Sequence, residues 1–152
     1  MKLIRTPEMK SDDKAVKRFC SYNDLDPESD YVVTMHKWNK ISTEQKHWPK
    51  DYKRVTWLRK VQVTTPNGEV FTTVYESHNS YFSTYKNGYS AWKGMKELPD
   101  QKCFVKECDN DVWRKLFVTK SHDGFGTRED CTVAILATAA KFIRTLEGEE
   151  VE

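Results

Sequence analysis

Acid–base chemistry in this chain has to be built from four histidines, which stand far apart in the sequence: His36, His47, His78 and His122. A histidine suits this work because its pKa lies close to neutral pH. His78 begins a His-x-Ser pattern with Asn79 and Ser80, and two such patterns can share the acid and base roles across a phosphodiester. No other histidine repeats the pattern. A phosphoesterase or nuclease that uses His78 and His122 is therefore the weakest of three functional hypotheses, and we assign no catalytic residue.

The chain has four cysteines, Cys20, Cys103, Cys108 and Cys131, and the last three could be grouped with His122 as a set of four metal ligands. Cys103 and Cys108 stand five apart in an expected strand, which would point them to opposite faces, and Cys131 begins an apolar helix. Structural zinc sites use shorter spacings. We therefore expect small buried apolar side chains here, with no metal and no cofactor. Four cysteines in a chain without a signal-like apolar run favour the reducing cytoplasm, or the host cytoplasm if the protein is viral. Because no apolar run is long enough to cross a membrane, we expect no membrane partner.

A glycine-containing loop before the last expected helix is a candidate anion site, formed by four residues: Gly124, Gly126, Thr127 and Arg128. Backbone N–H groups at a helix N-terminus attract anions. The loop lacks the Gly-Lys-Ser/Thr that ends a P-loop, and Glu129 and Asp130 would repel a phosphate there. A tight tether that leads into a capped helix is the simpler interpretation.

A basic segment with interspersed aromatic residues lies between His36 and Lys60. It contains eight Lys or Arg residues against two acids, although the whole chain has a formal charge of only +2. Such a segment is typical of a surface that follows a nucleic-acid backbone and stacks on its bases. Lysines that solvate a loop around buried tryptophans would give the same composition. The predicted nucleic-acid-binding residues are Lys37, Trp38, Trp48, Lys50, Lys53, Arg54 and Lys60.

Tyrosine, serine and asparagine are concentrated between residues 77 and 92. Tyrosine offers a large rigid contact area at a low cost in side-chain entropy, so this composition is typical of a protein-recognition surface. The second functional hypothesis is accordingly a protein-binding accessory or inhibitor protein, and the composition would suit a small viral one. The predicted protein-binding residues are Tyr81, Tyr85, Tyr89 and Trp92.

A β-hairpin from Val55 to Glu76 is the element that follows most directly from the sequence, because Pro66-Asn67-Gly68 joins two runs rich in β-branched and aromatic residues. A two-residue turn would place Val63 opposite Thr72. We favour a three-residue loop with Gly68 as the bulge residue, since it collects the large apolar groups on one face. That face would hold Trp57, Val61, Val63, Phe71, Thr73 and Tyr75. The other face would be free to meet solvent or a partner, and it would hold Lys60, Gln62, Thr64, Thr72 and Val74.

The chain before the hairpin predicts one helix between two strands. An edge strand at residues 1–4 precedes a helix that Ser11 caps and that ends before Asn23. A central strand follows at 31–37, with Val33 and Met35 on one face. Residues 39–53 have little apolar pattern, so we expect a polar connection there.

The chain after the hairpin predicts two helices and a second hairpin. The short helix spans 90–98, and the hairpin spans 102–120 with its turn at 109–111. The last helix starts after Thr127 and is apolar nearly all round from 131 to 143, so it should lie buried across the sheet.

These elements predict an α+β fold, in which a mainly antiparallel sheet of about five strands, including two hairpins, packs against an N-terminal helix and a buried C-terminal helix. A chain of 152 residues suits one domain. We expect that domain at 1–146, with the acidic residues 147–152 as a frayed tail. Because no motif carries known chemistry, we favour a small non-enzymatic binding protein whose partner is nucleic acid.

Overall fold

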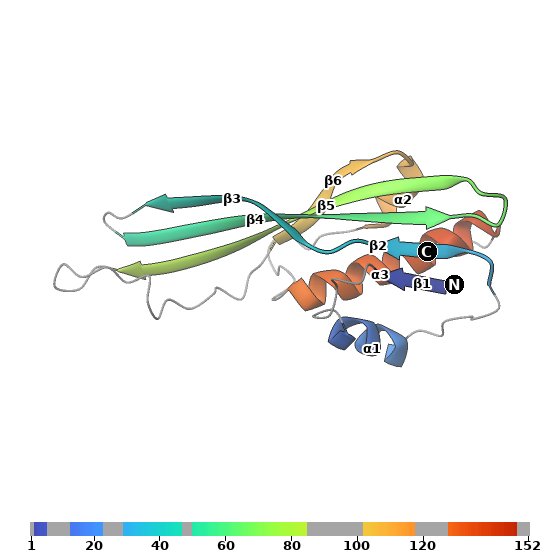
Figure 1. The fold of residues 1–152 in the computed structure, drawn as a ribbon, viewed down its shortest axis with the longest axis horizontal. Helices are drawn as coiled ribbons and strands as arrows, with labels where there is room; N and C mark the ends of the chain where they lie inside the picture. The colour runs from blue at the N-terminus through green and yellow to red at the C-terminus, as the bar shows by residue number, and fades with distance from the viewer. Residues whose placement is uncertain are drawn as a thin grey trace.

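A six-stranded sheet runs the length of the molecule (Figure 1). The computed structural model describes six stretches of the chain: residues 2–5, 13–22, 29–46, 50–84, 102–117 and 128–148. The strands are β1 (Lys2–Arg5), β2 (Val32–Met35), β3 (Asn39–Lys46), β4 (Lys50–Thr64), β5 (Val70–Thr84) and β6 (Lys102–Cys108). The helices are α1 (Asp13–Tyr22), α2 (Asp111–Leu116) and α3 (Arg128–Leu146).

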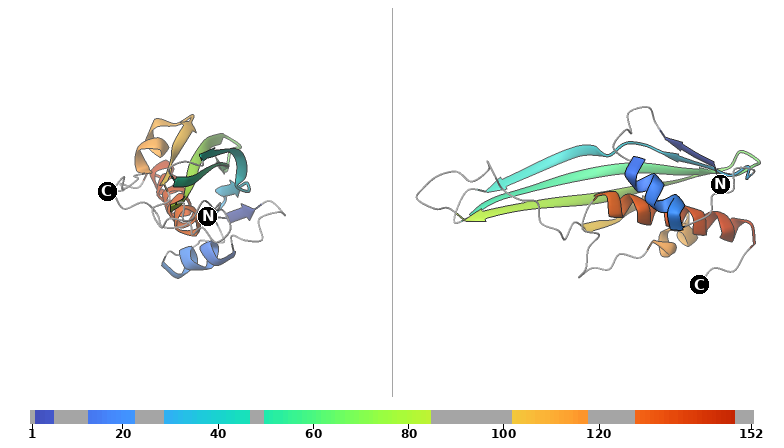
Figure 2. Two further views of the ribbon diagram at one scale, coloured as in Figure 1. Left: turned by 90° about the vertical axis from the view of Figure 1, so that its left-hand side faces the viewer. Right: turned by 90° about the horizontal axis from the view of Figure 1, so that it is seen from below.

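The strand order is β1-β2-β4-β5-β6, and β3 pairs with β4 beyond the end of β2. Only β1 and β2 are parallel, while the pairs from β2 to β6 are antiparallel. Seen from below, α1 and α3 lie over one face of this sheet (Figure 2). The predicted α+β class is therefore confirmed, together with the edge strand, the central strand and the two terminal helices.

The β4–β5 hairpin has the predicted three-residue loop. Thr65 N donates to Glu69 O at 2.9 Å, and Gly68 N donates to Thr65 O at 3.0 Å. Gly68 has a φ of 87°, which a glycine adopts without strain. Val63 therefore lies opposite Phe71, and the hairpin turns its apolar face toward the helices.

An arm formed by β3 and the adjoining halves of β4 and β5 projects beyond the helices (Figure 1). The polar connection predicted for 39–53 is wrong, because residues 39–46 form β3 and β4 begins at Lys50. Every β3 side chain is exposed, so neither face needs apolar residues and the sequence shows no alternation. Pairing with β4 is what selects the strand, since β2 leaves this part of the β4 edge without a partner.

The core lies between α3 and the body of the sheet. Ile135, Leu136, Ala139 and Phe142 of α3 are fully buried against strand residues that include Val61. Full burial of an aliphatic side chain contributes about 1.5 to 3 kcal/mol, so this contact dominates the stability. At the end of α3, Glu147 and Gly148 still donate to helix carbonyl groups, whereas the rest of the predicted acidic tail lies outside the described residues.

The second predicted hairpin is wrong in its second half. After β6 the chain forms α2, which Asn110 caps by accepting a hydrogen bond from Trp113 N at 3.0 Å. Arg114 and Lys115 stand in the last turn, where they complement the helix dipole. Trp113 is fully buried and stacks on Phe142 with ring centroids 5.0 Å apart. The helix places this indole in the core, and its own hydrogen bonds and the Asn110 cap pair the backbone N–H groups.

A buried tyrosine hydroxyl lies near this tryptophan. Tyr75 is fully buried, and its hydroxyl has no hydrogen-bond partner among the described residues. Burial, followed by Cys108, raises the pKa of Tyr75 well above its usual value, and the Trp113 indole, which lies close to the hydroxyl without the geometry of a hydrogen bond, opposes the shift. The folded protein therefore resists ionisation of this hydroxyl more strongly than the unfolded chain does.

We expect Tyr75→Phe to change the free energy of unfolding at neutral pH by less than about 1 kcal/mol, since no hydrogen bond of the hydroxyl is lost. Because the folded pKa is raised, the contribution of Tyr75 is fully present below about pH 10 and is lost as the pH rises further. Urea midpoints of both proteins between neutral pH and about pH 11 test this. The phenylalanine variant should lose less stability in alkali, and parallel pH curves would contradict the assignment.

Candidate functional site: the open face of the sheet

Among the described residues, helices cover one face of the sheet body and none covers the other (Figure 2). Side chains alternate between the faces of a strand, and Val61, Val63 and Tyr75 pack into the core with α3. The face that points away from the core is here called the open face. In the body it carries Lys60, Gln62, Thr72, Val74, Glu76, His78 and Phe104, and the arm continues it with Arg54 and Thr56.

A cluster of polar side chains lies on the open face where the arm leaves the body. Thr56 and His78 are directly opposed across β4 and β5, and Thr56 Oγ1 is 3.0 Å from His78 Nδ1. His78 Nε2 is 2.9 Å from Glu76 Oε2, and Glu76 Oε1 is 3.7 Å from Lys106 Nζ. Because a carboxylate only accepts, a neutral His78 donates from Nε2 to Glu76 and accepts a hydrogen bond at Nδ1 from the Thr56 hydroxyl.

An exposed aromatic ring adjoins this cluster. Phe104 lies opposite Glu76 in the β5–β6 pair and is 37% exposed. Its ring centroid is 5.6 Å from that of His78. An exposed aromatic ring on an antiparallel sheet is a platform on which an unpaired base can stack.

A β-bulge in β6 shapes both faces of this region. Val74 pairs with Glu107 and Tyr75 with Val105, so Lys106 is the extra residue. It stays within reach of Glu76 on the open face. The bulge also overturns the expectation that Cys103 and Cys108 face opposite sides, because their partners, Ser77 and Thr73, are both buried.

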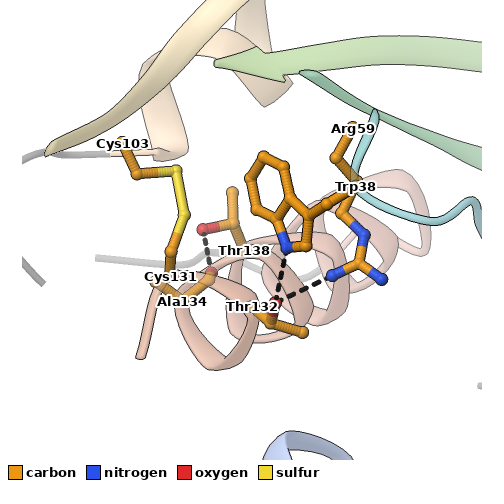
Figure 3. Close-up of a disulfide and its surroundings, with 7 residues drawn as sticks. All are labelled: Trp38, Arg59, Cys103, Cys131, Thr132, Ala134 and Thr138. Atoms are coloured by element: carbon orange, nitrogen blue, oxygen red, sulfur yellow. Dashed lines mark hydrogen bonds between the residues drawn. A yellow bond between two sulfur atoms is a disulfide. The ribbon is translucent and has the colours of Figure 1, made fainter. Parts of the chain in front are cut away.

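The cysteines differ from the prediction in their bonding as well. Cys103 and Cys131 are nearly or fully buried, as expected, but they form a disulfide that joins β6 to the first turn of α3 (Figure 3). Cys108 is a free thiol. Spacing in the sequence could not reveal the pair, because a disulfide depends on how β6 and α3 pack.

Trp38, a predicted base-stacking residue, packs inward. It is half-buried, and its Nε1 is 3.4 Å from Thr132 Oγ1 on α3 (Figure 3). The guanidinium carbon of Arg59 lies 5.2 Å from the centroid of its ring. Part of the ring is thereby covered, and we leave Trp38 out of the proposed surface.

Arg59, which contributes to the basic composition of the segment, is fully buried. Its Nε donates to His36 O at 2.6 Å, and its Nη1 donates to Thr132 Oγ1 at 2.8 Å. This guanidinium therefore links β4 to α3 and to the residue that follows β2. One of the eight basic residues between His36 and Lys60 is therefore used inside the protein and does not face a partner.

The other predicted nucleic-acid-binding residues are divided between the arm and the body. Lys50, Lys53 and Arg54 lie in the arm half of β4, whereas Lys60 is exposed on the open face of the body. Lys37 is exposed just before β3. Trp48 lies outside the described residues. The fold therefore places the lysines and Arg54 on or next to connected strands, but it does not bring them into one cluster.

The remaining candidate residues are mostly outside the described parts of the chain. This holds for Tyr85, Tyr89, Trp92, His122, Gly124, Gly126 and Thr127. Tyr81 is in β5, opposite Lys53, and Arg128 is the first residue of α3. The predicted protein and anion sites therefore remain predictions.

The sequence reasoning missed Thr56, Glu76, Phe104 and Lys106. Alternation within β5 could have placed Glu76 beside His78, since residues two apart share a face. Thr56 needed the exact register of the hairpin. Lys106 needed the bulge, which has no signature in the sequence of β6.

Comparison with known proteins adds no assignment: no family model, no curated protein and no solved structure matches this chain. Within the described residues, no helix has the length and apolar character needed to cross a membrane.

Proposed function

We propose that this protein binds single-stranded nucleic acid on the open face of its sheet. The observation that carries the proposal is the exposed ring of Phe104, which stands on the sheet face that no described helix covers, beside cationic side chains. Phe104 would stack on an unpaired base, while Lys60 and Lys106, both exposed, would contact phosphates.

The charge of the neighbouring strands supports the same partner. Besides the buried Arg59, β3 and β4 contain six cations against the two acids Glu44 and Asp51. The cations are Lys40, Lys46, Lys50, Lys53, Arg54 and Lys60. By the strand register, Lys46 and Arg54 continue the open face into the arm, together with Glu44, which lies directly opposite Arg54. A backbone that crosses the body beside Phe104 would therefore meet further positive charge along the arm.

Replacement of Phe104 by alanine is expected to weaken binding by about 1 to 3 kcal/mol, the usual contribution of one stacked base. Fluorescence anisotropy with labelled single strands of about twelve nucleotides measures this. Val112→Ala is the matched control, because it truncates another exposed apolar side chain, on α2. Phe104→Trp should retain affinity. Equal losses in the Phe104→Ala and Val112→Ala variants would contradict the stacking role.

The lysines have a separate readout, the dependence of affinity on salt. We expect Lys60→Gln with Lys106→Gln to reduce the slope of log affinity against log salt by about 1.4, which is about 0.7 for each lost phosphate contact. Lys14→Gln with Lys115→Gln removes two exposed charges from α1 and α2 as a control. No binding to any nucleic acid at low salt would rule out the proposal and redirect the search to a protein partner.

A further inference from the structure

The open face brings together three groups that can perform acid–base chemistry beside the proposed stacking ring. The side chains of Glu76, His78 and Lys106 are 16%, 11% and 42% exposed, so solvent reaches part of each. They are connected through both carboxylate oxygens of Glu76, one toward His78 and one toward Lys106. An imidazole can take up and return a proton, and an ammonium group can neutralise charge on a phosphate.

We propose that these residues form a metal-independent ribonuclease site for single-stranded RNA, an inference that rests on the proposed function. RNA carries its own nucleophile, the ribose 2′-hydroxyl, next to each phosphorus atom. The protein then needs only a base, an acid and a positive charge. On the open face His78 can act first as the base and then as the acid, Lys106 supplies the positive charge, and Phe104 supplies a place to hold the neighbouring base.

In the proposed step the 2′-oxygen attacks the adjacent phosphorus, and His78 accepts the proton that the hydroxyl loses. The attack gives a pentacoordinate phosphorane, and the bond between phosphorus and the 5′-oxygen of the next nucleotide breaks in a second step. The imidazolium returns the proton to the departing 5′-oxygen. The products are a 2′,3′-cyclic phosphate and a 5′-hydroxyl, and neither a metal nor an oxidant enters the balance.

The hydrogen bonds of His78 determine which nitrogen can act. Its Nε2 donates to Glu76, which would stabilise the imidazolium once it forms. Its Nδ1 accepts from Thr56, so the Thr56 hydroxyl occupies the place that the 2′-hydroxyl of a substrate would take. Lys106 Nζ is 3.7 Å from the other carboxylate oxygen of Glu76, and in the proposed step its long exposed side chain turns from Glu76 to the phosphorane and neutralises it.

The sequence-based nuclease hypothesis paired His78 with His122, which lies outside the described residues. The present site uses His78 with two different residues, Glu76 and Lys106. It therefore stands without a second histidine.

The test incubates the full chain with end-labelled single-stranded RNA in excess EDTA, in parallel with DNA and 2′-O-methyl RNA of the same base sequence. We expect cleavage of the RNA alone, with cyclic phosphate ends identified by mass spectrometry, and binding of all three strands. His78→Gln and Glu76→Gln should each reduce the cleavage rate at least about a hundredfold while binding is retained. Lys115→Gln should keep the activity, because Lys115 is exposed on α2 and is not part of the cluster.

The outcomes separate this inference from the function on which it rests. RNA that binds but stays intact, or cleavage that persists in His78→Gln purified in parallel, overturns the ribonuclease site and leaves nucleic-acid binding in place. An equal loss of cleavage in Lys115→Gln also overturns it, since the losses in the other variants would then not be specific to the cluster. Absence of binding to any strand overturns the proposed function itself.

Discussion

Replacement of Trp113 by alanine should lower the free energy of unfolding by about 3 to 5 kcal/mol, the range for a fully buried large aromatic side chain. Trp113 is completely buried and lies nearly parallel to Phe142, with an angle of 11° between the ring planes. It is also the buried residue of α2. Its loss would leave a large cavity and remove the contact that holds α2 to α3.

Urea unfolding followed by far-UV circular dichroism measures this effect without relying on tryptophan fluorescence. Val112→Ala is the matched control, because Val112 precedes Trp113 in the same helix and is 46% exposed. It should change stability by no more than about 0.5 kcal/mol. A loss below about 1 kcal/mol for Trp113→Ala would show that α2 does not anchor the core in this way.

Reduction of the disulfide between Cys103 and Cys131 should lower the free energy of unfolding by about 3 to 4 kcal/mol. The two residues are separated by 28 positions, and a cross-link that closes a loop of this length restricts the unfolded chain by about that amount. The disulfide spans the segment between α2 and α3, so reduction frees the start of α3 from β6.

Unfolding curves with and without a thiol reductant test this prediction. The double variant Cys103→Ala, Cys131→Ala should be insensitive to reductant, whereas Cys108→Ala should keep the full response because Cys108 is not in the disulfide. Equal curves for the oxidised and reduced natural chain would contradict it. Disulfides are rare in the cytosol, so the cytoplasmic location remains a prediction, and the redox state of this pair in cells is the measurement that bears on it.

The candidate site could be derived from the sequence only in part. His78 and Lys60 were identified as chemically capable residues, and the open face of the hairpin followed from its predicted loop. The polar neighbours of His78 in the proposed site, Thr56, Glu76 and Lys106, come from three strands. Their meeting depends on one bulge and on the pairing of β5 with a strand that follows it by more than fifteen residues.

The fold shows the same division between short-range and long-range information. Pro66-Asn67-Gly68 and the flanking β-branched residues determine the hairpin and its register, because turn geometry and side-chain alternation act over neighbouring residues. The long apolar run after residue 130 likewise determines a buried helix. Both were predicted correctly, since each carries its own local signal.

Tertiary structure decided the segments whose local signals were weak or balanced. The run after Asp109 contains β-branched and aromatic residues that suit a strand, but burial of Trp113 against Phe142 and the Asn110 cap favour a helix. Residues 39–46 become a strand because β4 presents a free edge to them. The amino-acid sequence by itself therefore determined the hairpin, the terminal helices and the α+β class, whereas packing between distant segments decided α2, β3, the disulfide and the polar cluster on the open face.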